Sequence, residues 1–83
     1  MSYLIEWNPR ALNAAARFLK DDPEGLQQVF TSVDFLAAEP RPEGSFPYGS
    51  DNLRRIRIGR YRVLYEIHDS TISIQVLKLG QVP

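Results

Sequence analysis

The residues with the clearest chemical potential are five arginines that lie within ten positions of one another. These residues are Arg54, Arg55, Arg57, Arg60 and Arg62. No acidic residue interrupts the segment 53–62 that contains them. A guanidinium keeps its proton in proteins and can form two parallel hydrogen bonds to an oxyanion. The cluster therefore indicates a phosphate-binding site, although the same side chains could instead form a solvated polar face.

Other kinds of site find little support in the composition. The chain has no cysteine and a single histidine, His68, which excludes a thiol nucleophile, a thiolate zinc site and a metal site built on imidazoles. Glu66 does not form part of a carboxylate pair, and the five glycines are too scattered for a phosphate-binding loop. We therefore expect neither a metal ion nor an organic cofactor.

Length and composition point to one ordinary globular domain that spans residues 1–83, with 43% hydrophobic and 24% charged residues. Ten basic and ten acidic residues cancel, so attraction to a nucleic acid has to come from a local basic patch. The chain starts without the pattern of a signal peptide, and no apolar run approaches the ~20 residues of a membrane helix. We expect a cytoplasmic protein that does not contact membranes.

The arginines need a scaffold, and the sequence predicts a β-hairpin for it. Segments 53–58 and 61–67 alternate apolar and polar residues, and Gly59-Arg60 between them suits a two-residue type II′ turn. Counting outward from the turn pairs Arg57 with Arg62 and Arg55 with Leu64. Arg55, Arg57 and Arg62 then share one face of the hairpin, opposite an apolar face. Two directly opposed arginines repel each other, so this arrangement favours an anionic ligand over a purely structural role.

The remaining elements should cover the apolar face of this hairpin. Asn8-Pro9 and Asp22-Pro23 each combine an N-cap residue with proline at the first helical position, which predicts two consecutive helices. Segments 3–7 and 71–79 read as strands, and 40–52 as a loop. The predicted fold is α+β with the order β-α-α-β-β-β, an antiparallel sheet and a helical hairpin packed on one face.

Several side chains receive definite places in this scheme. The first helix is expected to bury Leu12, Ala15, Ala16 and Leu19. The second is expected to bury a stripe at spacings of three and four residues, formed by Leu26, Val29, Phe30, Val33, Leu36 and Ala37. Phe46 and Tyr48 should pin the loop to the body, and the uncovered face should carry an apolar rim of Leu64, Leu77 and Leu79.

The segment 53–67, Leu-Arg-Arg-Ile-Arg-Ile-Gly-Arg-Tyr-Arg-Val-Leu-Tyr-Glu-Ile, resembles the signature of the RelE/ParE toxins. In both, a basic strand, a glycine-containing turn, a Tyr-Arg pair and an apolar strand with tyrosine follow one another. Weaker similarity extends to Asn8-Pro9, to 39–42 and to 76–80. The resemblance implies a RelE-like fold and a toxin of a type II toxin–antitoxin system, bound by an acidic RelB-like antitoxin that masks the basic face.

For a RelE-like member, the resemblance further implies a ribosome-dependent endoribonuclease that cleaves mRNA and inhibits translation without a metal. The RNA 2′-OH is then the nucleophile, and side chains supply a base, an acid and a cation for the charged phosphorane. Arg55, Arg57 and Arg62 match the basic positions of the family and are the expected catalytic residues. Arg54, Arg60 and Lys78 are expected to bind the substrate.

Two departures from the family pattern leave the reaction open. Ribosome-dependent members often have lysines where Arg55 and Arg57 stand, and arginine is a poor general base. Active members also tend to continue past the last strand with a basic, tyrosine-containing tail, whereas this sequence has Gln81 and stops at Pro83. The alternatives are a ParE-like toxin that binds DNA gyrase without chemistry of its own, and a catalytically impaired antitoxin-binding module.

Overall fold

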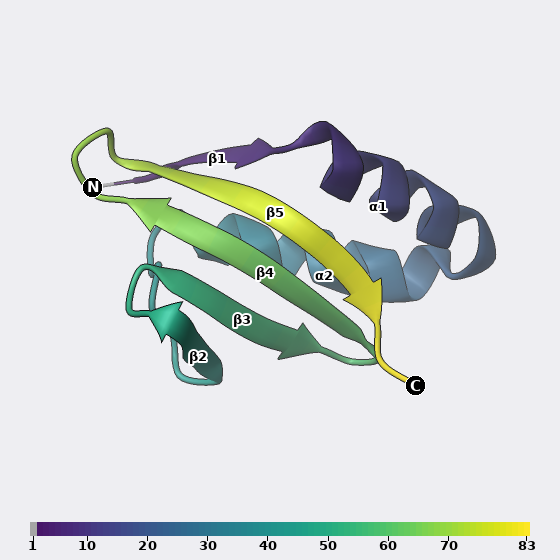
Figure 1. Cartoon of the computed structure of the whole chain (residues 1–83). Helices are drawn as coiled ribbons and strands as arrows, with labels where there is room; N and C mark the ends of the chain where they lie inside the picture. Colours follow the sequence, from purple (N-terminus) through teal and green to yellow (C-terminus); the bar gives the residue numbers. More distant parts are fainter. Residues whose placement is uncertain (1) are drawn as a thin grey trace.

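The computed structural model describes residues 2–83, which form two helices and five strands. In chain order these are β1 (Leu4–Trp7), α1 (Pro9–Asp21), α2 (Pro23–Phe35), β2 (Ser45–Ser50), β3 (Leu53–Ile58), β4 (Tyr61–His68) and β5 (Ser73–Gln81). The strands make one sheet in the order β1-β5-β4-β3-β2 (Figure 1). The predicted α+β class is confirmed. The expected purely antiparallel sheet is wrong, because β1 pairs with β5 in parallel.

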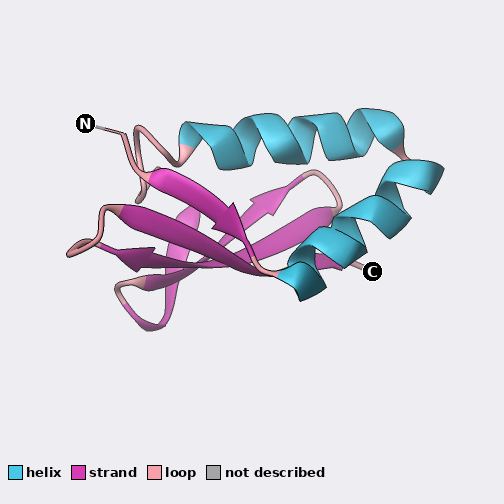
Figure 2. Ribbon diagram, turned by 90° about the horizontal axis from the view of Figure 1, so that it is seen from above, coloured by secondary structure: helices cyan, strands magenta, loops and turns pink. Residues whose placement is uncertain are grey.

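Both helices lie on the same side of the sheet, as predicted, and leave its other side uncovered by a helix (Figure 2). The predicted N-caps are present: the Asn8 side chain accepts a hydrogen bond from the Ala11 amide at 2.8 Å, and the Asp22 side chain accepts one from the Gly25 amide at 3.1 Å. Asp22 is also the only residue between the two helices, and they diverge from this junction. The cap residues thus fix where each helix starts.

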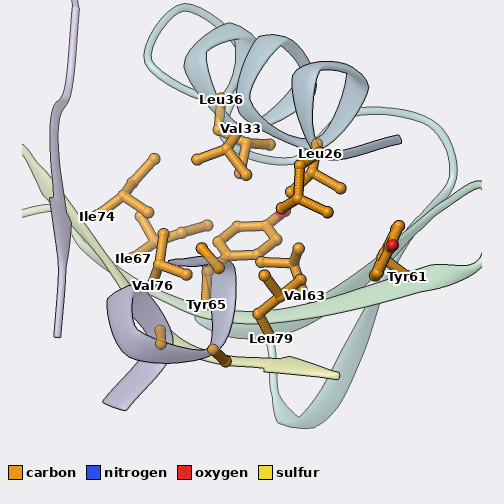
Figure 3. Close-up of a cluster of buried hydrophobic side chains, with 14 residues drawn as sticks. Leu26, Val33, Leu36, Tyr61, Val63, Tyr65, Ile67, Ile74, Val76 and Leu79 are labelled. Carbon is orange, nitrogen blue, oxygen red and sulfur yellow. The ribbon is translucent and has the colours of Figure 1, made fainter. Parts of the chain in front are cut away.

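The core lies between the helices and the covered face of the sheet (Figure 3). The expected stripe is confirmed over α2, with Leu26, Val29, Val33 and Leu36 buried and Phe30 partly buried, whereas Ala37 lies past the end of the helix and is partly buried. Opposite them, β4 and β5 contribute Tyr61, Val63, Tyr65, Ile67, Ile74, Val76 and Leu79. The alternation in β4 therefore sets the inner and outer faces of the sheet, as predicted.

The predicted buried face of α1 is wrong for three of its four residues. Leu12 and Leu19 are 53% and 43% exposed, and Ala16 is also exposed. The helix instead buries Ala11, Ala14 and Ala15. Alanine has so small a side chain that the helix backbone can approach the neighbouring strand closely, and α1 packs against β5 through this alanine face. The large leucine side chains therefore did not indicate which face of α1 packs on the sheet.

The segment 45–50, which the sequence predicts as part of a loop, forms the edge strand β2. Ser45, Phe46 and Pro47 pair with successive residues of β3 before the register becomes irregular. Proline is tolerated at a sheet edge because its missing amide costs no ladder bond there. Phe46 and Tyr48 are 65% and 50% exposed, so the expectation that they pin a loop to the body is wrong.

A β-bulge in β5 changes which of its residues face outward. Leu64 pairs with Lys78, but Tyr65 pairs with Val76, so Leu77 is the extra residue. Beyond the bulge the alternation is shifted, and Leu79 is buried in the core with 4% exposure. Leu79 therefore does not belong to the apolar rim of the uncovered face, where strict alternation with Leu77 had placed it.

Among residues 2–83, the structure contains no helix that is long and apolar enough to cross a membrane.

Candidate functional site

The predicted hairpin register is confirmed residue by residue. Ile58 pairs with Tyr61, Arg57 with Arg62 and Arg55 with Leu64. Gly59 has a φ of 61°, whereas Arg60 lies outside the positive-φ region, in agreement with a type II′ turn. With Tyr61 buried on the helix side, alternation puts Arg55, Arg57 and Arg62 on the sheet face that points away from both helices.

A pocket of about 310 Å³ lies on this uncovered face, at the end where β4 begins and β5 finishes. Three cationic side chains line it, Arg55, Arg62 and Lys78, and no acidic side chain does. The other lining residues are Tyr48, Leu64, Gly80, Gln81, Val82 and Pro83. We call this hollow the sheet pocket. Because like charges repel, three unneutralised cations around one cavity favour an anionic ligand there.

Tyr48 is a site residue that sequence reasoning missed. The Arg55 guanidinium lies over its ring, 4.7 Å from the centroid, a cation–π contact that holds the arginine at the pocket wall. Tyr48 belongs to the segment whose prolines and glycines indicated a loop. No strand pattern was recognised in this segment. The pairing of β2 with β3 brings Tyr48 beside Arg55.

Three of the five predicted site arginines, Arg54, Arg57 and Arg60, lie outside the sheet pocket. Arg57 is exposed, and its Nε donates a hydrogen bond to the carbonyl oxygen of Gly59 at 3.0 Å, which directs the side chain toward the hairpin turn. Arg60 is exposed in that turn. The structure thus brings Arg55 and Arg62 together with Lys78, and leaves Arg57 and Arg60 at the rim of the same end of the sheet.

Arg54 has a different place and requires a correction. It is only 8% exposed, and its guanidinium donates to the Ser45 hydroxyl and carbonyl at 3.1 and 3.2 Å and to the Asp51 carboxylate at 2.8 Å. Its position in β3 alternates with that of Arg55, so it points to the opposite side of the sheet. A buried, fully engaged guanidinium is a structural clamp between β2 and β3, and we remove Arg54 from the substrate-binding set.

Charges are segregated along the sheet. Of the ten lysines and arginines in the chain, only Arg41 and Arg54 form salt bridges with acids within residues 2–83. Arg41 pairs with Asp51 and Asp69, and Arg54 pairs with Asp51, at the end of the sheet remote from the sheet pocket. Hydrogen bonds from the Tyr3 hydroxyl and from Arg41 hold the pKa of Asp69 below its ordinary value. The acids near this end thus neutralise local arginines, and the cations of the pocket stay unpaired.

The site can bind and stabilise negative charge, but few of its groups can move a proton. Arginine does not deprotonate in proteins. Glu66 and His68 contact each other at 3.1 Å further along β4 and do not line the sheet pocket. The hydroxyl of Tyr48 and the ammonium of Lys78 are therefore the pocket groups that can exchange a proton with a bound ligand.

Residues 3–81 match the family model described as the ParE toxin of the type II toxin–antitoxin system parDE. The structure is similar to the isolated Escherichia coli RelE toxin, with a TM-score of 0.83, 19% identity, and coverage of 99% of this chain and 86% of that one. It is also similar to the RelE–RelB complex of Pyrococcus horikoshii OT3, with a TM-score of 0.78, 25% identity and coverage of 98% and 96%. The expected RelE-like fold is confirmed.

A third similar structure is the YoeB dimer of Staphylococcus aureus, with a TM-score of 0.78 at 16% identity and coverage of 100% of both chains. No curated protein matches the sequence at a significant level.

Proposed function

The chain belongs to the ParE toxin family of type II toxin–antitoxin systems, and we propose that it inhibits growth by binding a phosphodiester of ribosome-bound mRNA in the sheet pocket and promoting its cleavage. The single observation that carries the proposal is the group of three unpaired cations, Arg55, Arg62 and Lys78, around one cavity without an acid. A neutral or apolar ligand would leave their mutual repulsion uncompensated.

The proposed reaction uses the RNA itself as nucleophile. The 2′-oxygen attacks phosphorus, the bond to the leaving 5′-oxygen breaks, and a 2′,3′-cyclic phosphate remains. Arg55 and Arg62 stabilise the charge that builds up on the phosphorane oxygens, which is the role that fixed guanidinium groups perform best. Tyr48 in its phenolate form takes the proton from the 2′-OH and becomes the neutral phenol, and the Lys78 ammonium gives a proton to the 5′-oxygen. No metal or organic cofactor has a role in these steps.

The neutral net charge of the protein favours a substrate that is already held by a larger assembly, such as a ribosome. Long-range steering toward free RNA is weak without an overall positive charge, so binding depends on the local patch. On a ribosome, the mRNA is already held and the toxin can gain affinity from additional contacts. We therefore infer that cleavage depends on ribosomes in the cytoplasm.

A second candidate function is binding to DNA gyrase without chemistry of the toxin's own. The match to a ParE family model favours it. So does the composition of the sheet pocket, which lacks a histidine and a carboxylate to act as general base. A third reading, a catalytically impaired module that only binds its antitoxin, predicts neither mRNA cleavage nor gyrase inhibition.

We further propose an antitoxin as the stable partner of this chain. RelE proteins have been crystallised with RelB antitoxins, as in the complexes from Mycobacterium tuberculosis and P. horikoshii. An acidic antitoxin segment over Arg55, Arg57 and Arg62 neutralises the face that the helices leave open. A tagged toxin should co-purify with the product of the neighbouring reading frame, and no stable complex at micromolar concentration would contradict the assignment.

The decisive experiment is an in vitro translation reaction with purified toxin. Primer extension on the mRNA should reveal cuts that require ribosomes, and that disappear with Arg62→Ala. A parallel supercoiling assay with purified gyrase should show no inhibition. Gyrase inhibition without RNA cuts would instead establish the second function, and inactivity in both assays would establish the third.

A further inference from the structure

β5 pairs with β4 along its length, but the path of the chain after β1 leaves the opposite edge of β5 without a neighbouring strand over its second half. β1 pairs only with Ser73–Val76 of β5, and the amide of Asn8 then donates a last hydrogen bond to the Val76 carbonyl at 3.0 Å. Asn8 caps α1, so the chain leaves the sheet at this point. On this edge beyond Val76, α1 and not a strand lies beside β5 (Figure 1).

The orientation of α1 directs one basic flank of the helix toward this part of β5. Ala11, Ala14 and Ala15 face the core. Arg10 and Arg17 are seven residues apart, nearly two helical turns, and so lie on one side of the helix. Leu12 and Leu19 occupy the other flank and are exposed. Because the alanine face is buried, the flank next to β5 carries the arginines and not the leucines.

A second pocket, of about 370 Å³, lies between the helix and the strand, and we call it the helix pocket. Its lining consists of Arg10, Asn13, Ala14, Arg17, Lys78 and Leu79. Lys78 also lines the sheet pocket. The β-bulge at Leu77 creates this shared position, because it turns Lys78 outward at the border of the two cavities. The two pockets are consequently neighbours with one ammonium between them.

The helix pocket has the same electrostatic character as the sheet pocket. Arg10, Arg17 and Lys78 line it, no acidic side chain does, and none of the three forms a salt bridge within residues 2–83. The Asn13 amide adds two neutral hydrogen-bond donors. The guanidinium groups and the amide are groups that bind phosphate oxygens, and their mutual repulsion is relieved by an anion.

We propose that the helix pocket is a second phosphate subsite, which holds a neighbouring phosphodiester of the same RNA strand that occupies the sheet pocket. This inference rests on the proposed function and extends it from one phosphate to an extended strand. Lys78 lies between the subsites, so one strand can pass from Arg62 over β5 to Arg17 and meet a cation at each step. The ligand class is a single-stranded polyanion with regularly spaced charges.

Fluorescence anisotropy with uncleavable 2′-O-methyl RNA tests this path. A dinucleotide, with one phosphodiester, should report on the sheet pocket alone, whereas an oligonucleotide of about eight residues reaches both. Arg17→Gln should weaken binding of the longer RNA about fivefold near 0.1 M salt. It should also make the negative slope of log K against log salt shallower by about 0.7. Binding of the dinucleotide should stay unchanged, and Arg17→Lys should restore most of the affinity.

Lys20→Gln is the matched control. It removes one charge from the same helix, only three residues away, but Lys20 does not line the helix pocket. Equal effects of Arg17→Gln and Lys20→Gln on the longer RNA would overturn the second subsite. If Arg62→Ala then still weakens both RNAs, the proposed function survives that failure. If Arg62→Ala changes neither, the sheet pocket does not bind phosphate and both proposals fall.

Discussion

Arg62 lies directly opposite Gly80 across the β4–β5 pair. Both residues line the sheet pocket, and because glycine has no side chain, β5 adds no bulk beside the guanidinium at this point. A Cβ built on Gly80 meets no atom within 4 Å, and the backbone there is outside the left-handed region. The glycine is therefore not required by the backbone, and its place beside Arg62 keeps the cavity open.

Gly80→Thr should consequently block the sheet pocket without harming the fold. Threonine suits a strand better than glycine, so the melting temperature should stay equal or rise slightly. Growth inhibition on induced expression should fall strongly, while Gly80→Ala, whose methyl group finds free space, should keep most of it. Full toxicity of Gly80→Thr at normal expression would show that ligand does not enter this cavity.

Arg62→Ala should reduce the rate of ribosome-dependent cleavage by about 10²–10³, the usual loss when one donor to a developing oxyanion is removed. The melting temperature should be unchanged or slightly higher, because the mutation relieves the repulsion from Arg57 directly opposite. Arg62→Lys should recover activity only in part, since an ammonium cannot make the bidentate contact. Unaltered cleavage by Arg62→Ala would remove Arg62 from the mechanism.

Arg54 and Arg55 are neighbours in sequence with opposite expected roles. Arg54→Ala removes the guanidinium that donates hydrogen bonds to Ser45 and Asp51. The free energy of unfolding should fall by roughly 2–4 kcal/mol. Arg55→Ala should change stability by less than about 0.5 kcal/mol but impair RNA cleavage. Chemical denaturation together with the cleavage assay separates the two effects, and the reverse pattern would contradict the assigned faces of β3.

Stability should depend on pH through the junction between the helices. Hydrogen bonds from the Tyr61 hydroxyl and the Gly25 amide hold the pKa of Asp22 below its ordinary value. A carboxyl with a lowered pKa stabilises the fold above its unfolded pKa of about 3.9, and this stabilisation is lost as the pH falls through the folded pKa. The melting temperature, measured as a function of pH, should therefore fall below about pH 4.

Asp22→Asn should flatten part of this acid decline, because the charge that titrates is gone; the remainder belongs to Asp69, whose pKa is also lowered. Asp21→Asn is the control, since Asp21 lies next to Asp22 but does not accept the Tyr61 and Gly25 bonds. If the melting temperatures of Asp22→Asn and of the parent fall equally at low pH, this carboxyl does not set the pH dependence.

The sequence alone determined the features that depend on local rules. The N-caps at Asn8 and Asp22, the α2 stripe and the register from Arg55 to Leu64 were all predicted and are present. Each follows from interactions within a few residues or across a two-residue turn. The inward and outward faces of β3 and β4 then followed from alternation, and with them the outward direction of Arg55, Arg57 and Arg62.

Only the tertiary structure decided which cations meet in a pocket. The bulge at Leu77 moved Leu79 into the core and turned Lys78 outward, because one extra residue inverts all later positions of a strand. Pairing along the edge of β3 made a strand of 45–50 and brought Tyr48 to Arg55. Both depend on how strands pair with one another, and no local sequence pattern encodes that pairing.

The rotation of α1 about its own axis was decided in the same way. Its sequence offers a leucine flank and an alanine face, and hydrophobicity favours the leucines. The structure buries the alanines because close approach to β5 requires small side chains, and this choice places Arg10 and Arg17 beside Lys78. The sequence thus determined the fold class and the basic hairpin, whereas close packing between α1 and β5 determined how far the basic surface extends.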